Sequence, residues 1–219
     1  MRFDLEGLLI KVSGVTNEQD ALLAIGLGAN VIGFEMSSGP RQVSAQLVTE
    51  IVRRLPTGSQ TVGVFRGDMP QYVVEVANNS GLSGVQIEGP VSVGALGYIS
   101  ERVRTVMRMA PSVAAGTSAA QECDYLLLPE GDSRQDLIEA LDFMSEYDQF
   151  TPLIASGGLQ VDNVVDVVQN YPVSGVDVRS GVESSIGVID AGLMSDFIYN
   201  AKWAYDNSYV ERRHGFFEQ

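Results

Sequence analysis

The last two apolar segments of the chain, residues 152–158 and 175–181, end in small residues of a kind that binds anions. These small residues are Gly157, Gly158, Ser180 and Gly181. Glycine N–H groups can approach phosphate oxygens because no Cβ stands in the way, and a serine hydroxyl adds a further donor. The glycines could instead simply close tight turns, but two such endings in succession favour a phosphate site.

Polar side chains also lie at the ends of other apolar segments. They are Ser13, Glu35, Glu88, Glu130 and Asp177. Two carboxylates that face each other can serve as acid and base when burial separates their pKa values. Each carboxylate could equally be a solvated residue at the rim. Ser13 alone is a poor base near pH 7, because an alkoxide is harder to form than a thiolate.

One loop arginine is a candidate partner for a carboxylate ligand. Arg41 follows Gly39 and Pro40, shortly after the second apolar segment. A guanidinium group can bind a carboxylate through two parallel hydrogen bonds. A solvated loop arginine is the alternative interpretation of the same residue.

The composition argues against several other chemistries. The chain has one cysteine, Cys123, so neither an internal disulfide nor a cysteine-based zinc site can form. Its one histidine, His214, lies in a polar segment near the end of the sequence, which argues against a Ser–His–Asp triad. We therefore expect no metal site in this chain.

The charge and hydropathy of the chain limit its partners. The formal net charge is −14, which argues against a nucleic acid or an anionic membrane as the ligand. No apolar run reaches membrane-spanning length, and the first residues lack the apolar core of a signal peptide. We expect a cytoplasmic protein that binds a phosphorylated small molecule through local N–H groups and a few arginines.

Eight apolar segments alternate with segments of helical pattern along the 219 residues. They are residues 8–14, 30–36, 61–67, 84–89, 104–110, 124–130, 152–158 and 175–181. Continuous Val, Ile and Leu runs are typical of parallel strands buried on both faces. Eight strand–helix units predict a single (β/α)8 barrel domain over residues 1–219, with a C-terminal tail over 206–219. The polar side chains named above would then meet at the carboxyl ends of the strands.

Capping residues support the helical segments. Asn17 and Ser44 are placed to cap the first two helices, and Pro70 falls in the first turn of the third. Gly28 and Gly81 follow the first and third helices, where a left-handed residue commonly ends a helix.

Six stretches of the chain form a combined pattern that is more specific than any one of them. They are IKVSGVTNEQDAL, GANVIGFEMSSGPRQVS, VGVF, GVQIEG, LIASGGLQVDNV and GVDVRSGVESSIGVID. In order and spacing, these stretches resemble the phosphoribosylanthranilate isomerase family of tryptophan biosynthesis. The resemblance is strong at both ends of the chain and poor between residues 90 and 150.

The resemblance implies a cofactor-free (β/α)8 isomerase that performs an Amadori rearrangement of N-(5′-phosphoribosyl)anthranilate. A general acid protonates the ring oxygen and opens the sugar ring, and a general base then removes the C2′ proton. By the same resemblance, Arg41 faces the anthranilate carboxylate and Asp177 faces the anthranilate amine. The resemblance also assigns the phosphate to Gly157, Gly158, Ser180 and Gly181.

The chain departs from the family pattern where the acid–base chemistry occurs. Ser13 stands where the family has its catalytic cysteine, and Pro129 stands where it has its aspartate acid. Glu88 replaces a histidine and Ile189 replaces a lysine. We expect Ser13 and Glu130 at the catalytic positions, since the longer side chain of Glu130 can restore the reach of the missing acid.

Three functional hypotheses follow from this combination. The first is a phosphoribosylanthranilate isomerase-like enzyme, an intramolecular oxidoreductase with altered acid and base residues. The second is a catalytically impaired phosphosugar-binding barrel that acts as a sensor or partner subunit. The third is an isomerase for a different phosphoribosyl amine. The first is favoured because Arg41, Asp177 and the phosphate-type turns all serve a substrate.

Overall fold

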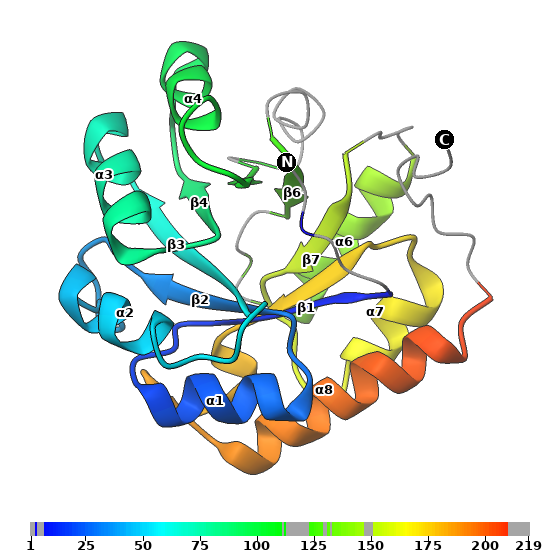
Figure 1. Ribbon diagram of the computed structural model, residues 1–219. Coiled ribbons are helices and arrows are strands. Elements are labelled where there is room, and N and C mark those ends of the chain that lie inside the picture. Colours follow the sequence, from blue (N-terminus) through cyan, green and yellow to red (C-terminus); the bar gives the residue numbers. More distant parts are fainter. Residues whose placement is uncertain are drawn as a thin grey trace, which may run out of the picture.

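Eight parallel strands close into a barrel in the order β1 to β8 (Figure 1). The computed structural model describes residues 3, 7–110, 112, 123–128, 131, 133–146 and 151–209. The strands are β1 Leu9–Ser13, β2 Val31–Glu35, β3 Gln60–Arg66, β4 Gly84–Glu88, β5 Val106–Met109, β6 Tyr125–Leu127, β7 Leu153–Ser156 and β8 Gly175–Val178. The predicted (β/α)8 fold is therefore confirmed.

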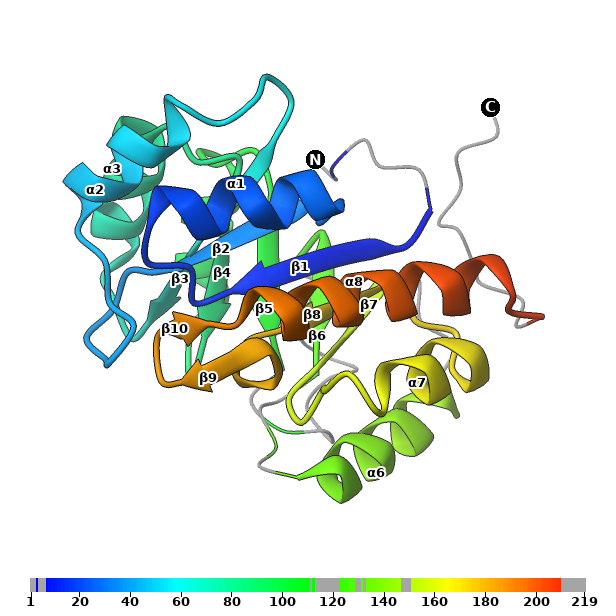
Figure 2. The ribbon, with the colours of Figure 1, turned by 90° about the horizontal axis from the view of Figure 1, so that it is seen from below.

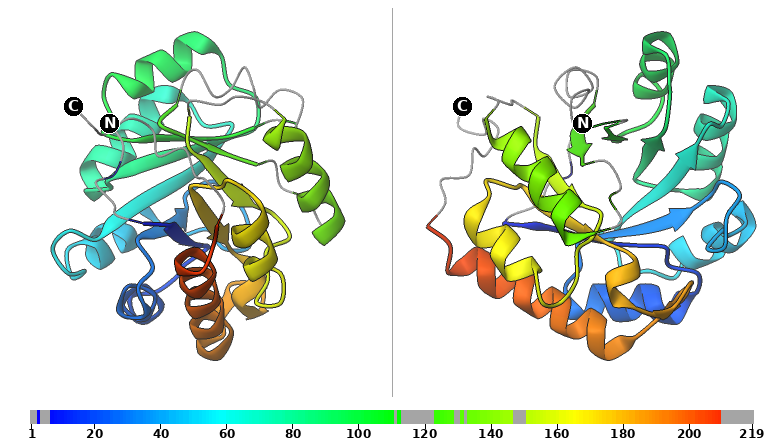
Figure 3. Two further views of the ribbon diagram at one scale, coloured as in Figure 1. Left: turned by 90° about the vertical axis from the view of Figure 1, so that its right-hand side faces the viewer. Right: turned by 180° about the vertical axis from the view of Figure 1, so that it is seen from behind.

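Helices surround this barrel on the outside. Within the described residues they are α1 Glu18–Leu27, α2 Ala45–Val52, α3 Pro70–Ser80, α4 Val93–Ser100, α6 Arg134–Ser145, α7 Val164–Asn170 and α8 Ala191–Asp206. Figure 2 shows α8 lying between α1 and α7, and Figure 3 shows α6, α7 and α8 following one another around the barrel. The predicted tail over 206–219 is described only as far as residue 209. No helix of the described residues is long and apolar enough to cross a membrane.

The predicted capping residues begin and end the helices as expected. The side chains of Asn17 and Ser44 accept hydrogen bonds from backbone N–H groups in the first turns of α1 and α2. Pro70 is the first residue of α3. Gly28 and Gly81 end α1 and α3 in the left-handed conformation, with φ of 100° and 71°. A side chain is strained at such angles, which is why glycine ends these helices.

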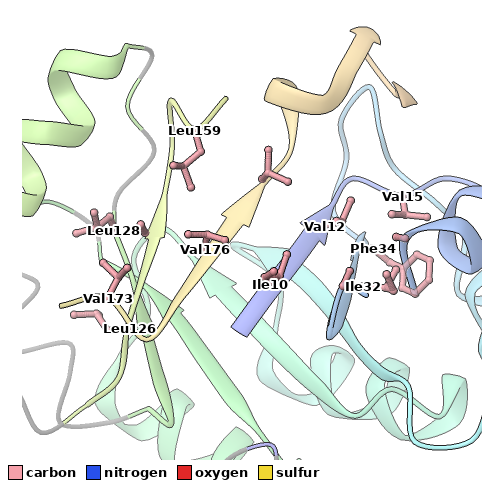
Figure 4. Close-up of a cluster of buried hydrophobic side chains, with 14 of the residues drawn as sticks. Ile10, Val12, Val15, Ile32, Phe34, Leu126, Leu128, Leu159, Val173 and Val176 are labelled. Carbon is pink, nitrogen blue, oxygen red and sulfur yellow. The ribbon is translucent and has the colours of Figure 1, made fainter. Parts of the chain in front are cut away.

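The core has two layers because successive side chains of a strand point to opposite faces. One layer lies between strands and helices and includes Ile10, Val12, Ile32 and Phe34 (Figure 4). The other layer fills the inside of the barrel, and Leu9 belongs to it. Residues 11 and 13 of β1 share the inward face with Leu9, so the barrel is apolar at one end and polar at the end where the strands finish.

A short extension follows β8 and lies beside the barrel mouth. It consists of a 3-10 turn, Ser180–Val182, and an antiparallel pair of strands, β9 Glu183–Ser185 and β10 Val188–Ile189. Helix α8 begins directly after this pair, with Asp190 as its N-cap. The extension places Glu183 within hydrogen-bond distance of Arg41, which lies in the loop after β2.

Candidate active site

A cavity of about 180 Å³ lies at the carboxyl ends of the strands. Its described lining residues are Ser13, Glu35, Gln86, Glu88, Met109, Gly131, Ser156, Gly157, Gly158, Leu159, Gln160, Asp177, Arg179 and Ser180. Seven of the candidate residues named from the sequence line it together, namely Ser13, Glu35, Glu88, Gly157, Gly158, Asp177 and Ser180. The mouth of the barrel is thus the place where the predicted site residues converge.

Three buried polar side chains form a hydrogen-bonded group at the end of β1. Lys11 Nζ donates to Asp177 Oδ2 at 2.8 Å and also to the hydroxyl of Ser13. Ser13 Oγ donates to Asp177 Oδ1 at 2.7 Å. The group has room because Gly33 lies opposite Ser13 on β2, where a Cβ would be 2.7 Å from Ser13 Oγ. We call Lys11, Ser13 and Asp177 the buried triad.

The electrostatics of the buried triad centre on Asp177. Burial raises the pKa of this carboxyl above its ordinary value, whereas the charge of Lys11 and the hydrogen bonds from Lys11 and Ser13 act in the opposite direction. A carboxylate whose pKa is raised by burial gains proton affinity. Asp177 is therefore suited to accept a proton through the hydroxyl that donates to it.

The turn after β7 is held in a conformation that only glycine adopts easily. Gly157 and Gly158 have φ of 77° and 66°. A Cβ on Gly158 would lie 2.6 Å from the carbonyl oxygen of Ser133, the N-cap of α6. Asn163 Nδ2 donates to the carbonyl of Gly158 at 2.8 Å, which fixes the turn against the start of α7. The N-cap residues of α6 and α7 therefore both constrain this turn.

The turn after β8 packs directly against the turn after β7. A Cβ on Gly181 would lie 2.0 Å from the carbonyl oxygen of Leu159, so glycine is required there for the two turns to meet. Gly181 does not line the cavity, whereas Ser180 does. The N–H groups of Gly157, Gly158, Ser180 and Gly181 have no hydrogen-bond partner in the part of the chain that the structure describes. Unpaired N–H groups beside a cavity are suited to an anion.

The remaining carboxylates of the mouth are held by arginines. Glu88 accepts hydrogen bonds from Arg66 Nε at 3.1 Å and from Gln86 Nε2 at 2.8 Å. Glu35 Oε1 accepts a hydrogen bond from Arg179 Nη1 at 3.1 Å. The predicted acid, Glu130, lies outside the described residues, as do Pro129 and His214.

Arg41 lies beside the mouth but is not among the described residues that line the cavity. Its Nε and Nη2 each donate to Glu183 at 2.6 Å, and the hydrogen bonding of Arg41 to this carboxylate is the main reason that the pKa of Arg41 is raised. Glu183 also accepts a hydrogen bond from the N–H of Gly187 at 3.0 Å. The role of Arg41 toward a ligand stays a prediction.

Sequence reasoning missed three residues in and beside the mouth: Lys11, Gln86 and Glu183. Lys11 was detectable, because a lysine inside an apolar strand needs a buried partner. Arg179 lies in the last predicted apolar segment, residues 175–181, at the strand end where site residues were expected, and it lines the cavity. Among the described residues, no group of three or more His, Cys, Asp or Glu side chains could hold a metal ion.

The fold is a (β/α)8 barrel whose cavity lies at the carboxyl ends of the strands, which is where enzymes of this fold have their active sites. A family model described as N-(5′-phosphoribosyl)anthranilate (PRA) isomerase matches residues 10–200. The chain belongs to this family, which confirms the resemblance found in the sequence.

Individual relatives agree with the family match. The N-(5′-phosphoribosyl)anthranilate isomerase of Thermotoga neapolitana is 32% identical over 202 residues, which cover 88% of this chain and 98% of the relative. The enzyme of the same name from Geobacter sulfurreducens is 31% identical over 198 residues, which cover 88% of this chain and 98% of the relative.

Solved structures show the same arrangement. A crystal structure of phosphoribosyl anthranilate isomerase with reduced 1-(o-carboxyphenylamino)-1-deoxyribulose 5-phosphate has a TM-score of 0.78 and 29% identity, and covers 90% of this chain and 99% of that chain. The enzyme from Thermotoga maritima has a TM-score of 0.79 at 29% identity, with the same coverage of 90% and 99%.

Proposed function

We propose that this chain catalyses the isomerisation of N-(5′-phosphoribosyl)anthranilate to the corresponding 1-amino-1-deoxyribulose 5-phosphate. The observation that carries the proposal is the buried triad of Lys11, Ser13 and Asp177, with Ser13 and Asp177 facing the same cavity as the two glycine-containing turns. The turns supply donors for a phosphate, and the triad supplies a route for a proton. Both requirements of the reaction are thus met in one cavity.

In this proposal the substrate phosphate binds at the turns after β7 and β8. The N–H groups of Gly157, Gly158 and Ser180 donate to its oxygens. Local donors of this kind suit a chain with a net charge of −14, because that overall charge does not attract an anion from a distance. A phosphorylated sugar is too polar to cross a bilayer unaided, so the proposal also places the protein in the cytoplasm.

The proton of C2′ leaves through Ser13 and Asp177. Ser13 Oγ takes the C2′ proton while its own proton passes to Asp177 Oδ1, so the serine is neutral before and after the step. The C–H electron pair forms the C1′=C2′ bond of an enolamine, and the iminium nitrogen accepts the displaced pair. Burial favours the protonated Asp177 that results, because it raises the pKa of this carboxyl.

Ring opening needs a proton on the furanose oxygen, and we assign its delivery to Glu130. This assignment rests on sequence position, two residues beyond the described end of the segment that contains β6. The described carboxylates Glu35 and Glu88 are each engaged by an arginine. Glu130 therefore remains the candidate acid.

The loss of substrate fluorescence after addition of purified protein tests the proposal. We expect turnover well above the rate in buffer, and we expect Ser13→Ala to lower kcat by about 10²-fold or more, because the relay is broken. A rate equal to that of buffer at high enzyme concentration would contradict the proposal.

A gain of function provides a second test. Ser13→Cys combined with Pro129→Asp restores the acid and base residues of the family pattern. Acid and base groups are each typically worth about 10²–10⁴-fold, so activity should rise by orders of magnitude. A folded double variant with no gain would show that the cavity positions a different molecule.

A phosphosugar-binding barrel without turnover is the second candidate function. It is favoured by the fact that the Ser13 hydroxyl already accepts from Lys11 and donates to Asp177, as a purely structural serine would. Calorimetry separates the two candidates. A phosphorylated ligand that binds without any turnover supports the second, and measurable turnover supports the first.

A further inference from the structure

Arg41 uses only one edge of its guanidinium group within the protein. Its Nε and Nη2, which form the side-on edge, each donate to Glu183 at 2.6 Å. In the part of the chain that the structure describes, Nη1 makes no hydrogen bond. A guanidinium has five N–H donors and can bind a second carboxylate through the end-on edge that Nη1 and Nη2 form. Arg41 therefore has this end-on edge available for a ligand.

Glu183 is itself held in place by the hairpin that carries it. Its side chain is 4% exposed, and the N–H of Gly187 donates to its Oε1 at 3.0 Å. Gly187 lies in the turn between β9 and β10 and has a φ of 78°. The hairpin thus provides both the carboxylate and a backbone donor that orients it. Because a bidentate pair fixes geometry as well as adding energy, Glu183 can hold the guanidinium of Arg41 in one plane.

No second cation competes with Arg41 for Glu183. Among the described residues, the ion pair with Arg41 is the one that Glu183 forms. The register partner of Glu183 on β10 is Ile189, which is uncharged. A lysine in that register position would lie within reach of the Glu183 carboxylate, because directly opposed side chains of an antiparallel pair interact. The apolar partner therefore leaves the carboxylate to Arg41.

The side chain of Arg41 lies at the edge of the cavity. A Cβ on Gly14 would lie 2.8 Å from Cδ of Arg41, and Gly14 directly follows Ser13, which lines the cavity. The hydrogen bonding and the charge of Glu183 are the main causes that raise the pKa of Arg41, and the charge of Glu35, another lining residue, adds to them. Arg41 is thus close enough for a ligand that extends from the cavity to reach its end-on edge.

We propose that Glu183 is a positioning residue, which holds the side-on edge of Arg41 so that the end-on edge binds the aromatic carboxylate of the substrate. This inference rests on the proposed function, because that function supplies a ligand with an aromatic carboxylate. Glu183 acts through Arg41 and does not itself touch the substrate. Without Glu183 the cation remains but is free to turn, so ordering it on binding weakens the contact with the carboxylate.

Calorimetry with two ligands tests this role on the full-length protein. One ligand is reduced 1-(2-carboxyphenylamino)-1-deoxyribulose 5-phosphate, and the other is the same molecule without the carboxylate. The ratio of their affinities is the carboxylate preference, and because both ligands keep the phosphate, this ratio isolates the carboxylate. We expect the wild type to prefer the first ligand by about 10- to 100-fold, the usual value of a hydrogen-bonded charged contact. Arg41→Met should abolish the preference.

Variants of the hairpin separate positioning from simple charge. Glu183→Met should lower the carboxylate preference by about 3- to 10-fold, the usual cost of ordering one long side chain on binding. Glu183→Gln should keep most of the preference, because the amide oxygen still accepts from Arg41. Ile189→Lys should lower the preference, because the added ammonium competes for Glu183. If Glu183 were only a competing negative charge, Glu183→Met and Glu183→Gln would both increase the preference.

A matched control is available in a second Arg–Glu pair. Glu18 and Arg54 pair at the same N–O distance of 2.6 Å, and neither of them lines the cavity. Glu18→Met should therefore keep the full carboxylate preference. In the fluorescence assay, Glu183→Met should raise KM and leave kcat nearly unchanged, since the carboxylate does not react. Thermal unfolding of each variant confirms that the barrel is folded.

The outcomes separate the inference from the proposed function. The inference is overturned if Glu183→Met keeps or increases the preference, if Glu183→Gln loses as much as Glu183→Met, or if Arg41→Met keeps the preference. It is also overturned if the wild type shows no preference or binds neither ligand. A wild type whose preference depends on Glu183 but which has no turnover supports the role of Glu183 and contradicts the proposed activity. Turnover without any carboxylate preference supports the activity and overturns the role of Glu183.

Discussion

The mouth of the barrel has two sides that are built from different parts of the chain. The glycine side consists of backbone N–H groups at Gly157, Gly158 and Ser180. The side-chain side consists of Lys11, Ser13, Asp177, Glu35 and Arg179. Backbone donors are fixed by turn geometry and have no charge to balance, whereas each side chain of the other side depends on an ionic partner. A single substitution should therefore affect the side-chain side far more than the glycine side.

The largest effect is expected from Asp177→Asn, which removes the proposed final proton acceptor. We expect kcat to fall by about 10³–10⁴-fold in the fluorescence assay. In the wild type, the acidic limb of the kcat/KM profile should lie above the ordinary carboxyl range, because the pKa of Asp177 is raised and the relay needs its ionised form. An active Asp177→Asn variant would contradict the relay.

Lys11→Met should have the next largest effect, this time on stability. It leaves the Asp177 carboxyl buried without its cation, and breaking a buried pair costs about 3–5 kcal/mol of unfolding free energy. Without the cation the folded state holds the Asp177 proton more tightly than the unfolded state does. The variant should therefore become less stable as the pH rises through the raised pKa of Asp177.

Urea unfolding at about pH 5 and about pH 8 measures this pH dependence. The double variant with Lys11→Met and Asp177→Asn is the matched control, since it removes both charges. It should regain most of the stability and none of the activity. If Lys11→Met alone is as stable as the wild type, the buried triad is not a coupled group.

On the glycine side, Gly158→Ala should have a moderate effect. Its Cβ meets the carbonyl of Ser133 at 2.6 Å, and its φ of 66° is strained for alanine. We expect a stability loss of about 1–3 kcal/mol and a clear drop in affinity for inorganic phosphate by calorimetry. Gly67→Ala is the control, because its φ is similar, at 75°, and a Cβ there meets nothing within 4 Å. Equal losses of phosphate affinity in both variants would contradict the phosphate assignment.

The smallest effect is expected from Ser133→Ala. Ser133 caps α6 in a reciprocal capping box with Asp136, and its loss should cost about 1 kcal/mol in thermal or urea unfolding. The carbonyl of Ser133 packs against Gly158 and is retained in alanine, so phosphate affinity should change little. A loss of affinity as large as that of Gly158→Ala would show that the cap itself shapes the turn.

Much of the fold could be predicted from local features. The cap side chains of Asn17 and Ser44 and the left-handed Gly28 and Gly81 act within one turn of helix. The strand bounds predicted from the sequence agreed less well with the structure. Of the segment expected over 124–130, the described residues 124–128 pair as a strand over Tyr125–Leu127.

The sequence alone determined the barrel, its family and the glycine turns, because each strand, helix cap, motif and turn that indicates them is formed by residues close together in the chain. Only the tertiary structure decided the partners on the side-chain side. Lys11 and Asp177 are 166 residues apart, and Arg179 and Glu35 are 144 apart. Closure of the barrel brings β8 beside β1, and no local pattern shows which charges will then meet. The pairing of Arg41 with Glu183, 142 residues away, was hidden for the same reason.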